Sequence, residues 1–371
     1  MKHSLLCAFC ALLILSLFVA CSHEQTHRTK KVNGVIWSFM IDGSGATIER
    51  AQNGSPAFCS TKAQSPRKLS IPAKLGGKTV MRIGEGAFKD CTELQSVVIP
   101  NGVTNISEAA FQNCVSLQSV QFPQTLKQIG LEAFQGCAKL TELSLPQGLV
   151  LIDSAAFKRC ASLKELILPE GLVKVHAAAF HDCVNLRSVV IPQSLRKIPN
   201  AMFYKCARLE SIVLPETLRE IESFAFADCV SLQGIELPAG LEKLGVSVFS
   251  GCSHLMTIAL PDKLTSVPHF TFSDSGIVRV YFPKNIKQIG MQAFCRCFNL
   301  REIKIPEGTE RIEDEAFACC MSLSDVQLPE SLVFIGARAF VGTNLSEIRL
   351  PRKFPYNPKN AFSRNVTIIK P

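Results

Sequence analysis

The chain has 371 residues, of which 47% are apolar and 19% charged, which excludes an intrinsically disordered protein. Length alone would allow two or three ordinary domains. The formal net charge of +9 at pH 7 suits acidic partners such as sulfated glycans, anionic host proteins or an anionic cell surface. Nucleic acid would fit the charge alone, but no nucleic-acid-binding motif is present.

Residues 1–20 have the pattern of a secretory signal peptide. A short polar start with one lysine precedes an apolar run over residues 5–20, which only Ser16 interrupts if cysteines count as apolar. The alternative is a membrane anchor helix, but a run of about 16 residues falls just short of the usual spanning length. We therefore predict that the protein is exported.

Residues 17–22 resemble a bacterial lipobox, in which signal peptidase II cleaves before a cysteine that becomes lipid-modified. Phe18 stands where the usual pattern has leucine, a departure that spirochaete-type lipoboxes accept. The resemblance implies lipidation of Cys21, and a multi-chain lipid is a stable membrane anchor. Residues 21–31 are polar and are predicted to form a tether, in preference to a metal site at their two histidines.

Residues 32–68 are predicted to form an N-terminal cap and a loop. Two apolar runs, residues 35–41 and 46–48, flank the turn residues 42–45, which is the pattern of a β-hairpin. The only tryptophan of the sequence lies in the first run. Residues 53–67 are rich in Ser, Pro, Gln and Lys and indicate a loop.

Residues 69–371 repeat one pattern of 23 residues, L-x-x-I-x-L-P-x-x-L-x-x-I-G-x-x-A-F-x-x-C-x-x, with a clean copy at residues 117–139. A fixed period of this length is typical of a solenoid. The copies are marked by thirteen phenylalanines, 23 residues apart except for two steps of 22: Phe88, Phe111, Phe134, Phe157, Phe180, Phe203, Phe226, Phe249, Phe272, Phe294, Phe317, Phe340 and Phe362.

Each copy combines short extended segments with a bend. Residues 117–122 end in the alternation of a strand that Pro123 stops, and residues 126–129 form a second extended piece. Residues 133–137 fit one helical turn or a tight bend. Stacked copies bury their apolar side chains continuously, and the ends need caps. We therefore predict a β-rich solenoid, a curved stack of about thirteen repeats with short strands and single helical turns.

These motifs resemble those of the BspA-like, or treponemal-type, leucine-rich repeat family. The motifs L-x-x-I-x-L-P and I-G-x-x-A-F, and the cysteine three residues after the phenylalanine, cover the chain from about Leu69 onward. Residues 71–84 are similar to the extended first repeat of such proteins. The resemblance implies a curved solenoid on a bacterial surface, used for adhesion to host proteins or other cells, and it does not imply an enzyme.

Ten of the sixteen cysteines share one repeat position. Zinc sites use short C-x-x-C pairs with histidines nearby, whereas these cysteines recur at the repeat period, which favours a buried ladder of free thiols over a chain of disulfides. Cys295 and Cys319 lie outside the column, one repeat apart, and are better disulfide candidates. The column consists of Cys91, Cys114, Cys137, Cys160, Cys183, Cys206, Cys229, Cys252, Cys297 and Cys320.

The outward strand positions of a solenoid make a continuous surface, and that surface binds partners. Three adjacent outward residues, Ile167, Val190 and Val213, are apolar and β-branched. They are explained by strand propensity on a surface ladder, by cover from flanking side chains, or by an exposed patch for a partner. The whole column reads Val98, Gln121, Ser144, Ile167, Val190, Val213, Glu236, Ala259, Tyr281, Lys304, Gln327 and Arg349.

A second candidate on this face is a basic stripe with one aromatic residue. Glu302, Asp325 and Glu347 dilute the stripe, and an ordinary solvated charged face is the commoner explanation. Its members are Arg279, Tyr281, Arg301, Lys304 and Arg349.

No catalytic motif stands out from the repeat, and the histidines at 176, 181, 254 and 269 fall at different repeat offsets. We therefore predict no enzyme, no cofactor, no metal site and no nucleic acid. The favoured interpretation is a lipoprotein of the bacterial outer membrane or cell surface that binds protein ligands, such as host extracellular matrix or other bacterial surfaces. The alternatives are a periplasmic envelope scaffold and a binding module for acidic glycans. The ligand, the binding face and the oligomeric state stay open.

Overall fold

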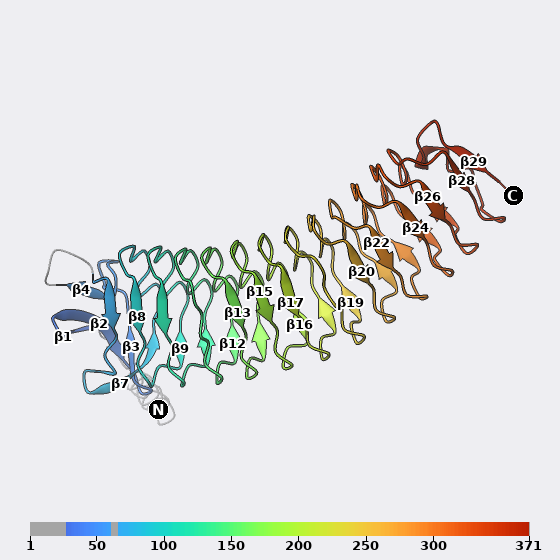
Figure 1. Ribbon diagram of the computed structural model, residues 1–371. Helices are drawn as coiled ribbons and strands as arrows, with labels where there is room; N and C mark the ends of the chain where they lie inside the picture. Colours follow the sequence, from blue (N-terminus) through green and yellow to red (C-terminus); the bar gives the residue numbers. More distant parts are fainter. Residues whose placement is uncertain (1–26, 61–65, 371) are drawn as a thin grey trace, which may run out of the picture.

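The computed structural model describes residues 27–60 and 66–370, which form one elongated solenoid. The chain winds from an N-terminal cap to the C-terminus, and the rod bends gradually along its C-terminal half (Figure 1). The predicted β-rich solenoid of 23-residue repeats is confirmed. The predicted signal peptide, Cys21 and the start of the tether lie outside the described residues.

The N-terminal cap is a small antiparallel sheet in which β2 pairs with β1, β3 and β4. Residues 28–31, expected in the tether, instead belong to β1, because Asn33 and Gly34 have positive φ and form a two-residue hairpin turn. β3 also pairs with the parallel strand β7, which joins the cap to the solenoid. The strands of the cap are β1 (Arg28–Val32), β2 (Val35–Ile41), β3 (Ala46–Ile48) and β4 (Phe58–Ser60).

The first strand of each coil lies on what we name the first side. Neighbouring strands pair in parallel, mostly in groups of two or three. The strands of this side are β5 (Lys68–Ser70), β8 (Ser96–Val98), β10 (Ser119–Gln121), β13 (Glu165–Ile167), β15 (Ser188–Val190), β17 (Ser211–Val213), β20 (Thr257–Ala259), β22 (Arg279–Tyr281), β24 (Glu302–Lys304), β26 (Asp325–Gln327), β28 (Glu347–Arg349) and β29 (Thr367–Ile369).

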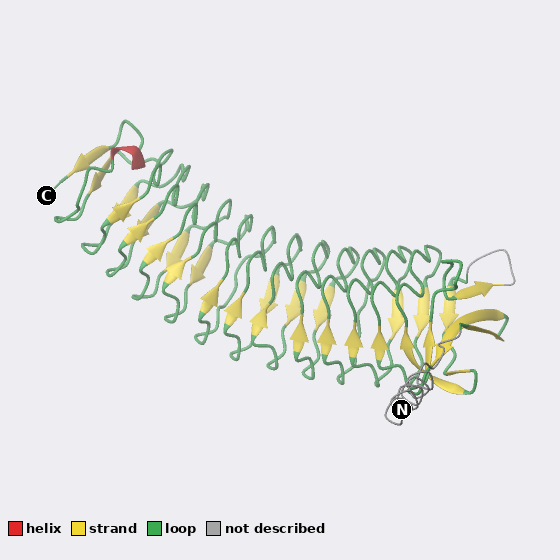
Figure 2. Cartoon of the chain, turned by 180° about the vertical axis from the view of Figure 1, so that it is seen from behind, coloured by secondary structure: helices red, strands yellow, loops and turns green. Residues whose placement is uncertain are grey.

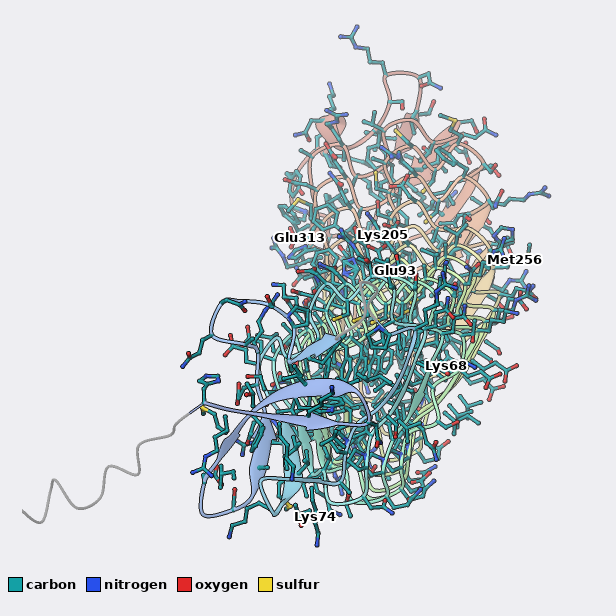
Figure 3. All side chains as sticks on the ribbon, turned by 90° about the vertical axis from the view of Figure 1, so that its left-hand side faces the viewer. Lys68, Lys74, Glu93, Lys205, Met256 and Glu313 are labelled. Carbon is teal, nitrogen blue, oxygen red and sulfur yellow. The ribbon has the colours of Figure 1, made fainter. Side chains whose placement is uncertain are left out.

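The second strands form the second side, and the hairpin of β6 (Lys74–Leu75) with β7 begins it. Seen along the rod, Lys68 and Met256 lie on one flank and Glu313 on the other (Figure 3). The strands of this side are β7 (Lys78–Ile83), β9 (Asn105–Ile106), β11 (Gln128–Ile129), β12 (Leu151–Ile152), β14 (Lys174–Val175), β16 (Lys197–Ile198), β18 (Glu220–Ile221), β19 (Lys243–Leu244), β21 (Ser266–Val267), β23 (Gln288–Ile289), β25 (Arg311–Ile312) and β27 (Phe334–Ile335).

The third side of each coil is a run of tight turns, where the sequence allowed one helical turn or a bend. The backbone amides of residues 132–137 donate hydrogen bonds in two alternating directions. The amides of residues 133, 135 and 137 donate to the carbonyl three residues earlier. The amides of Glu132, Phe134 and Gly136 donate to carbonyls of the next coil at 2.7–3.0 Å. Glu132 and Gly136 have positive φ. Across the described residues, the one helix is the short 3-10 helix η1 (Lys359–Ala361), drawn in red in Figure 2.

The phenylalanine column is the centre of the core. The thirteen rings stack one per coil, with neighbouring centroids 4.9–6.0 Å apart and ring planes within 18° of parallel. At the N-terminal end, Trp37 packs edge-on and Phe58 packs face-on against Phe88. The cap therefore supplies the aromatic contacts that a preceding coil would make.

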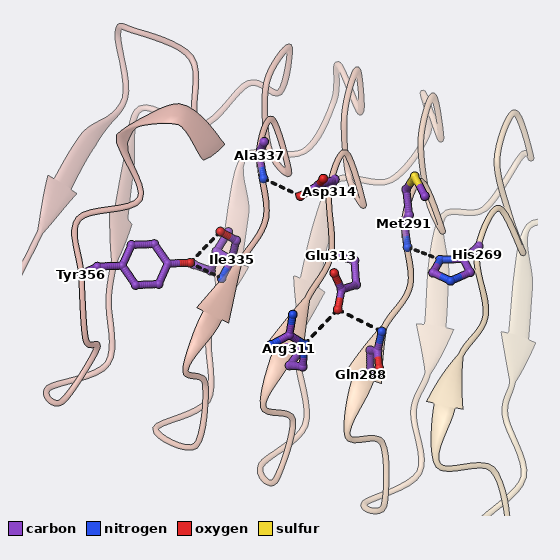
Figure 4. Close-up of polar contacts among 9 residues, drawn as sticks. All are labelled: His269, Gln288, Met291, Arg311, Glu313, Asp314, Ile335, Ala337 and Tyr356. Carbon is purple, nitrogen blue, oxygen red and sulfur yellow. Dashed lines mark hydrogen bonds and ion pairs between the residues drawn. The ribbon is translucent and has the colours of Figure 1, made fainter.

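Tyr356 closes the edge of the second side near the C-terminus. Its hydroxyl donates to the carbonyl of Ile335 at 2.8 Å and accepts from the amide of the same residue at 2.9 Å (Figure 4). One side chain thus satisfies both backbone groups that β27 would present to a following strand. An unpaired strand edge is a site for unwanted pairing, and Tyr356 blocks it.

Replacing Phe203 by alanine should lower the free energy of unfolding by about 3–5 kcal/mol, because the ring is fully buried and stacked on both sides. Urea unfolding followed by circular dichroism measures the change. Phe298→Ala is the matched control: that ring is 46% exposed, and its loss should change stability by less than about 1 kcal/mol. Equal effects of the two substitutions would show that the column does not carry the core.

Candidate binding surface

The twelve residues expected to face outward from the first side are all exposed. They alternate with buried neighbours, as Leu166 and Val189 illustrate at 1% exposure each. The strands therefore present one continuous outer column along the rod. This column contains every residue that the sequence analysis proposed for partner binding except Arg279 and Arg301, which lie on the same side beside it.

Ile167, Val190 and Val213 form what we name the apolar ladder. β13, β15 and β17 pair in register, so that Ile167 lies opposite Val190 and Val190 opposite Val213. Their side chains are 69%, 41% and 60% exposed. No flanking side chain covers them, so the ladder is a contiguous apolar strip of three neighbouring coils in a column whose other apolar aliphatic residues, Val98 and Ala259, stand singly.

Two grooves border the apolar ladder, and the sequence analysis did not find them. Residues 142–144 and 234–236 occupy strand positions but form no strand, so the sheet β13–β15–β17 is interrupted on both sides. A groove of about 530 Å³ lies at the first interruption and reaches Ile167. A groove of about 810 Å³ lies at the second and reaches Val213. We name the second one the Gly234 groove.

The only sequence signal for the Gly234 groove is Gly234 itself, which stands where the two preceding coils have Ser188 and Ser211. Glycine weakens a strand and has no side chain to fill the space above it. Residues 142–144 carry no comparable signal, because glutamate, leucine and serine occur at these positions in paired coils as well.

The basic stripe is less uniform than its sequence suggests. Arg279 forms an ion pair with Glu302 at 3.3 Å. The pKa of its guanidinium is raised, mainly by its contact with Tyr281 and to a smaller extent by Glu302. Arg279 and Arg301 line a hollow of about 610 Å³, and Arg349 lines a separate one of about 340 Å³. The arginines of the stripe therefore line two separate hollows. In the first hollow, Glu302 partly neutralises the positive charge of Arg279.

Within the described ranges, no group of His, Cys, Asp and Glu side chains could hold a metal ion. The histidines make contacts between coils: Nδ1 of His269 accepts the amide of Met291 at 2.8 Å (Figure 4), and His176 contacts Asp153 at 2.7 Å. Burial lowers the pKa of His181. No helix in the part of the chain that the structure describes is long and apolar enough to span a membrane.

The cysteine column is a ladder of free, buried thiols. From Cys114 onward, each Sγ lies 3.0–3.4 Å from the carbonyl oxygen of the phenylalanine in the preceding coil, as with Cys160 and Phe134. Burial raises the pKa of six of these thiols, to about 12 for Cys183. The six are Cys137, Cys160, Cys183, Cys206, Cys229 and Cys252. Cys295 and Cys319 are half-buried and also free, so the disulfide suggested for them is not formed in this structure.

Parallel strands on two sides, a bend on the third and one leucine-, phenylalanine- and cysteine-rich coil per repeat define a leucine-rich repeat solenoid. The family model of the BspA type leucine rich repeat region matches residues 55–186, 173–301 and 287–370. The chain belongs to this family.

Two solved structures illustrate the relationship. A leucine-rich repeat protein from Bacteroides ovatus ATCC 8483 is 29% identical, with 93% of this chain and 98% of that chain covered and a TM-score of 0.60. A leucine rich cell surface protein from Faecalibacterium prausnitzii A2-165 is 22% identical, with 92% and 95% covered and a TM-score of 0.50, which is a likeness of fold alone. No curated protein matches the chain.

Alkylation of the folded protein by iodoacetamide should modify Cys295 but not the cysteine column, because the column is buried. Burial and the neighbouring Cys319 raise the pKa of Cys295 to about 11. Since the thiolate is the nucleophile, the rate at Cys295 should keep rising with pH up to about 11. Peptide mapping by mass spectrometry measures it. A rate that levels off near pH 9 would contradict the raised pKa.

Proposed function

We propose that this protein is an exported leucine-rich repeat protein that binds host or cell-surface proteins through the first side, with the apolar ladder at the centre of contact. The observation that carries the proposal is the exposure of three adjacent β-branched residues in register. Exposed contiguous apolar strips are uncommon on soluble proteins without a partner. Strand propensity explains β-branched residues on a strand, but it does not explain why three occur together on only these rungs.

The architecture supports binding through many weak contacts. The ladder lies on paired strands over a close-packed core, so its side chains lose little freedom when a partner covers them. The grooves at the two ends of the apolar ladder add concave surface that a partner can contact. Leucine-rich repeat proteins of this kind are binding scaffolds, and we propose no catalysis for this one.

The signal-peptide pattern and the lipobox-like residues 17–22 support export and a lipid anchor at Cys21. The name of the Faecalibacterium protein places that relative at the cell surface. On this basis we propose that the solenoid is displayed on the outer membrane or cell surface. The rival location is the periplasm, where the same solenoid would act as an envelope scaffold.

Acidic glycans are a second candidate ligand, favoured by three cationic side chains of the first side. Arg301, Lys304 and Arg349 are exposed and form no ion pair with any residue in the described ranges. A sulfated glycan would be attracted by these charges and by the net charge of the chain. Such binding would weaken steeply with added salt, whereas contact with the apolar ladder would not.

Replacing Ile167, Val190 and Val213 together by serine should weaken binding to a panel of purified extracellular-matrix proteins by about tenfold or more, because central apolar contacts dominate interface energies. Surface plasmon resonance measures the affinities, and circular dichroism checks the fold. Val98→Ser is the matched control, since Val98 is an outward valine of the same column, 41% exposed and distant from the ladder. Unchanged affinity of the triple variant would reject the ladder as the binding site.

Protease treatment of intact, unpermeabilised cells should digest the protein while a periplasmic control protein survives. Surface display leaves the whole first side open to the protease, whereas the outer membrane protects periplasmic proteins. Immunoblotting with and without permeabilisation measures the outcome. Protection until the envelope is broken would reject adhesion and favour the periplasmic scaffold.

A further inference from the structure

The Gly234 groove continues the apolar ladder. Its lining extends over four coils, from β17 across the unpaired residues 234–236 and β20 to Tyr281 in β22. Val213 is both the last residue of the ladder and part of the groove wall. A partner that covers the ladder would therefore reach the groove without leaving the first side.

The groove carries uncompensated negative charge in a basic protein. Glu216 and Glu236 both line it and are exposed, and neither carboxylate forms an ion pair with a residue that the structure describes. Arg219 lies near, but its guanidinium donates to the backbone carbonyl of Glu216 at 2.8 Å. Arg279 does not line the groove; its guanidinium contacts Tyr281 at the far end of the lining and forms an ion pair with Glu302.

The uncharged part of the lining suits the remainder of a long cationic side chain. Val213 and Ala259 offer apolar surface for a methylene stem, since lysine and arginine bury their stems against apolar surface. Tyr281 is 54% exposed and offers an aromatic ring, which attracts a cation placed over its face. A neutral or acidic side chain would use neither the carboxylates nor this ring attraction.

Gly234 leaves its part of the groove open. A Cβ atom built on Gly234 would meet nothing within 4 Å, and the residue does not have a positive φ. A larger side chain could therefore be accommodated there without disturbing the backbone, and it would occupy the space now available to a ligand.

We propose that the Gly234 groove binds a lysine or arginine side chain of an extended segment of the partner protein, while apolar residues of the same segment cover the apolar ladder. This inference rests on the proposed function and adds the chemistry of the partner: a cationic segment rather than an acidic one. Tyr281 is the one member of the basic stripe that lines this groove, and the cationic members of the stripe do not line it.

The test uses two acetylated and amidated peptides, one in which lysine alternates with valine and one in which glutamine replaces every lysine. Fluorescence anisotropy should show that the lysine peptide binds the full-length protein at least about tenfold more tightly, because charge-assisted contacts contribute on this scale. Its affinity should fall as salt is added. Equal binding of the two peptides would overturn the proposal.

Two variants test the site itself. Gly234→Phe fills the groove, and the pair Glu216→Gln and Glu236→Gln removes its charge; each should weaken binding of the lysine peptide by about tenfold. The matched controls lie outside the groove: Ser119→Phe at the same strand position in another coil, and Glu307→Gln with Glu347→Gln. Binding that survives both groove variants, or that the controls reduce equally, would overturn the site.

The outcome is separable from that of the proposed function. If the groove variants keep full affinity for matrix proteins while the apolar-ladder variant loses it, the proposed cation-binding role of the groove fails and the ladder function stands. If the ladder variant also keeps full affinity, the proposed function fails as well. Unfolding midpoints equal to that of the unmodified protein exclude misfolding as the cause of any loss.

Discussion

The backbone hydrogen bonds of the third side, together with the phenylalanine column beneath them, hold the solenoid together. Each coil places residues such as Glu132 in the left-handed region, at a cost of about 1–2 kcal/mol for a residue with a Cβ. This backbone conformation lets three amides of each coil donate hydrogen bonds to the next coil, and the phenylalanine ring of each coil stacks on the next ring. Neither gain exists for an isolated repeat, so the coils are stable only as a stack.

The spacing of this column also bears on the shape of the rod. Strands in a sheet lie about 4.8 Å apart, whereas ring centroids between Phe180 and Phe272 are separated by 5.7–6.0 Å. Coils that are spaced unequally on different sides fan apart, and the rod is curved (Figure 1). Ring spacing does not by itself interrupt the strands, because β13, β15 and β17 pair in register within the widely spaced part of the column.

The repeat itself was predictable because its signal is periodic. Phe, Cys and Pro recur at fixed offsets, and these give the coil, the buried column and the outward positions of Ile167 or Lys304. For the third side the sequence predicts only a helical turn or a bend, because the turn depends on left-handed residues of many types, such as Ala109 and Arg159. The turn at Asn33 and Gly34 did carry a sequence signal, but the polar residues before it favoured a tether. The grooves form where the strand hydrogen bonds between neighbouring coils are missing. Such bonds join segments one repeat apart in the sequence, so no local sequence pattern predicts their loss.

The position of the apolar ladder follows from these constraints. Inward residues of the first side are fixed by the core, so only outward residues are free to vary for binding. A strip of three rungs between two interrupted rungs combines a rigid apolar centre with concave, polar ends. Interfaces commonly have this arrangement, with an apolar centre and a polar rim. Because Glu216 and Glu236 border the strip while the free cations lie further along the rod, one face presents two chemically distinct surfaces. The chain as a whole is basic, yet the apolar ladder adjoins two carboxylates, so the net charge does not describe the local charge beside this strip.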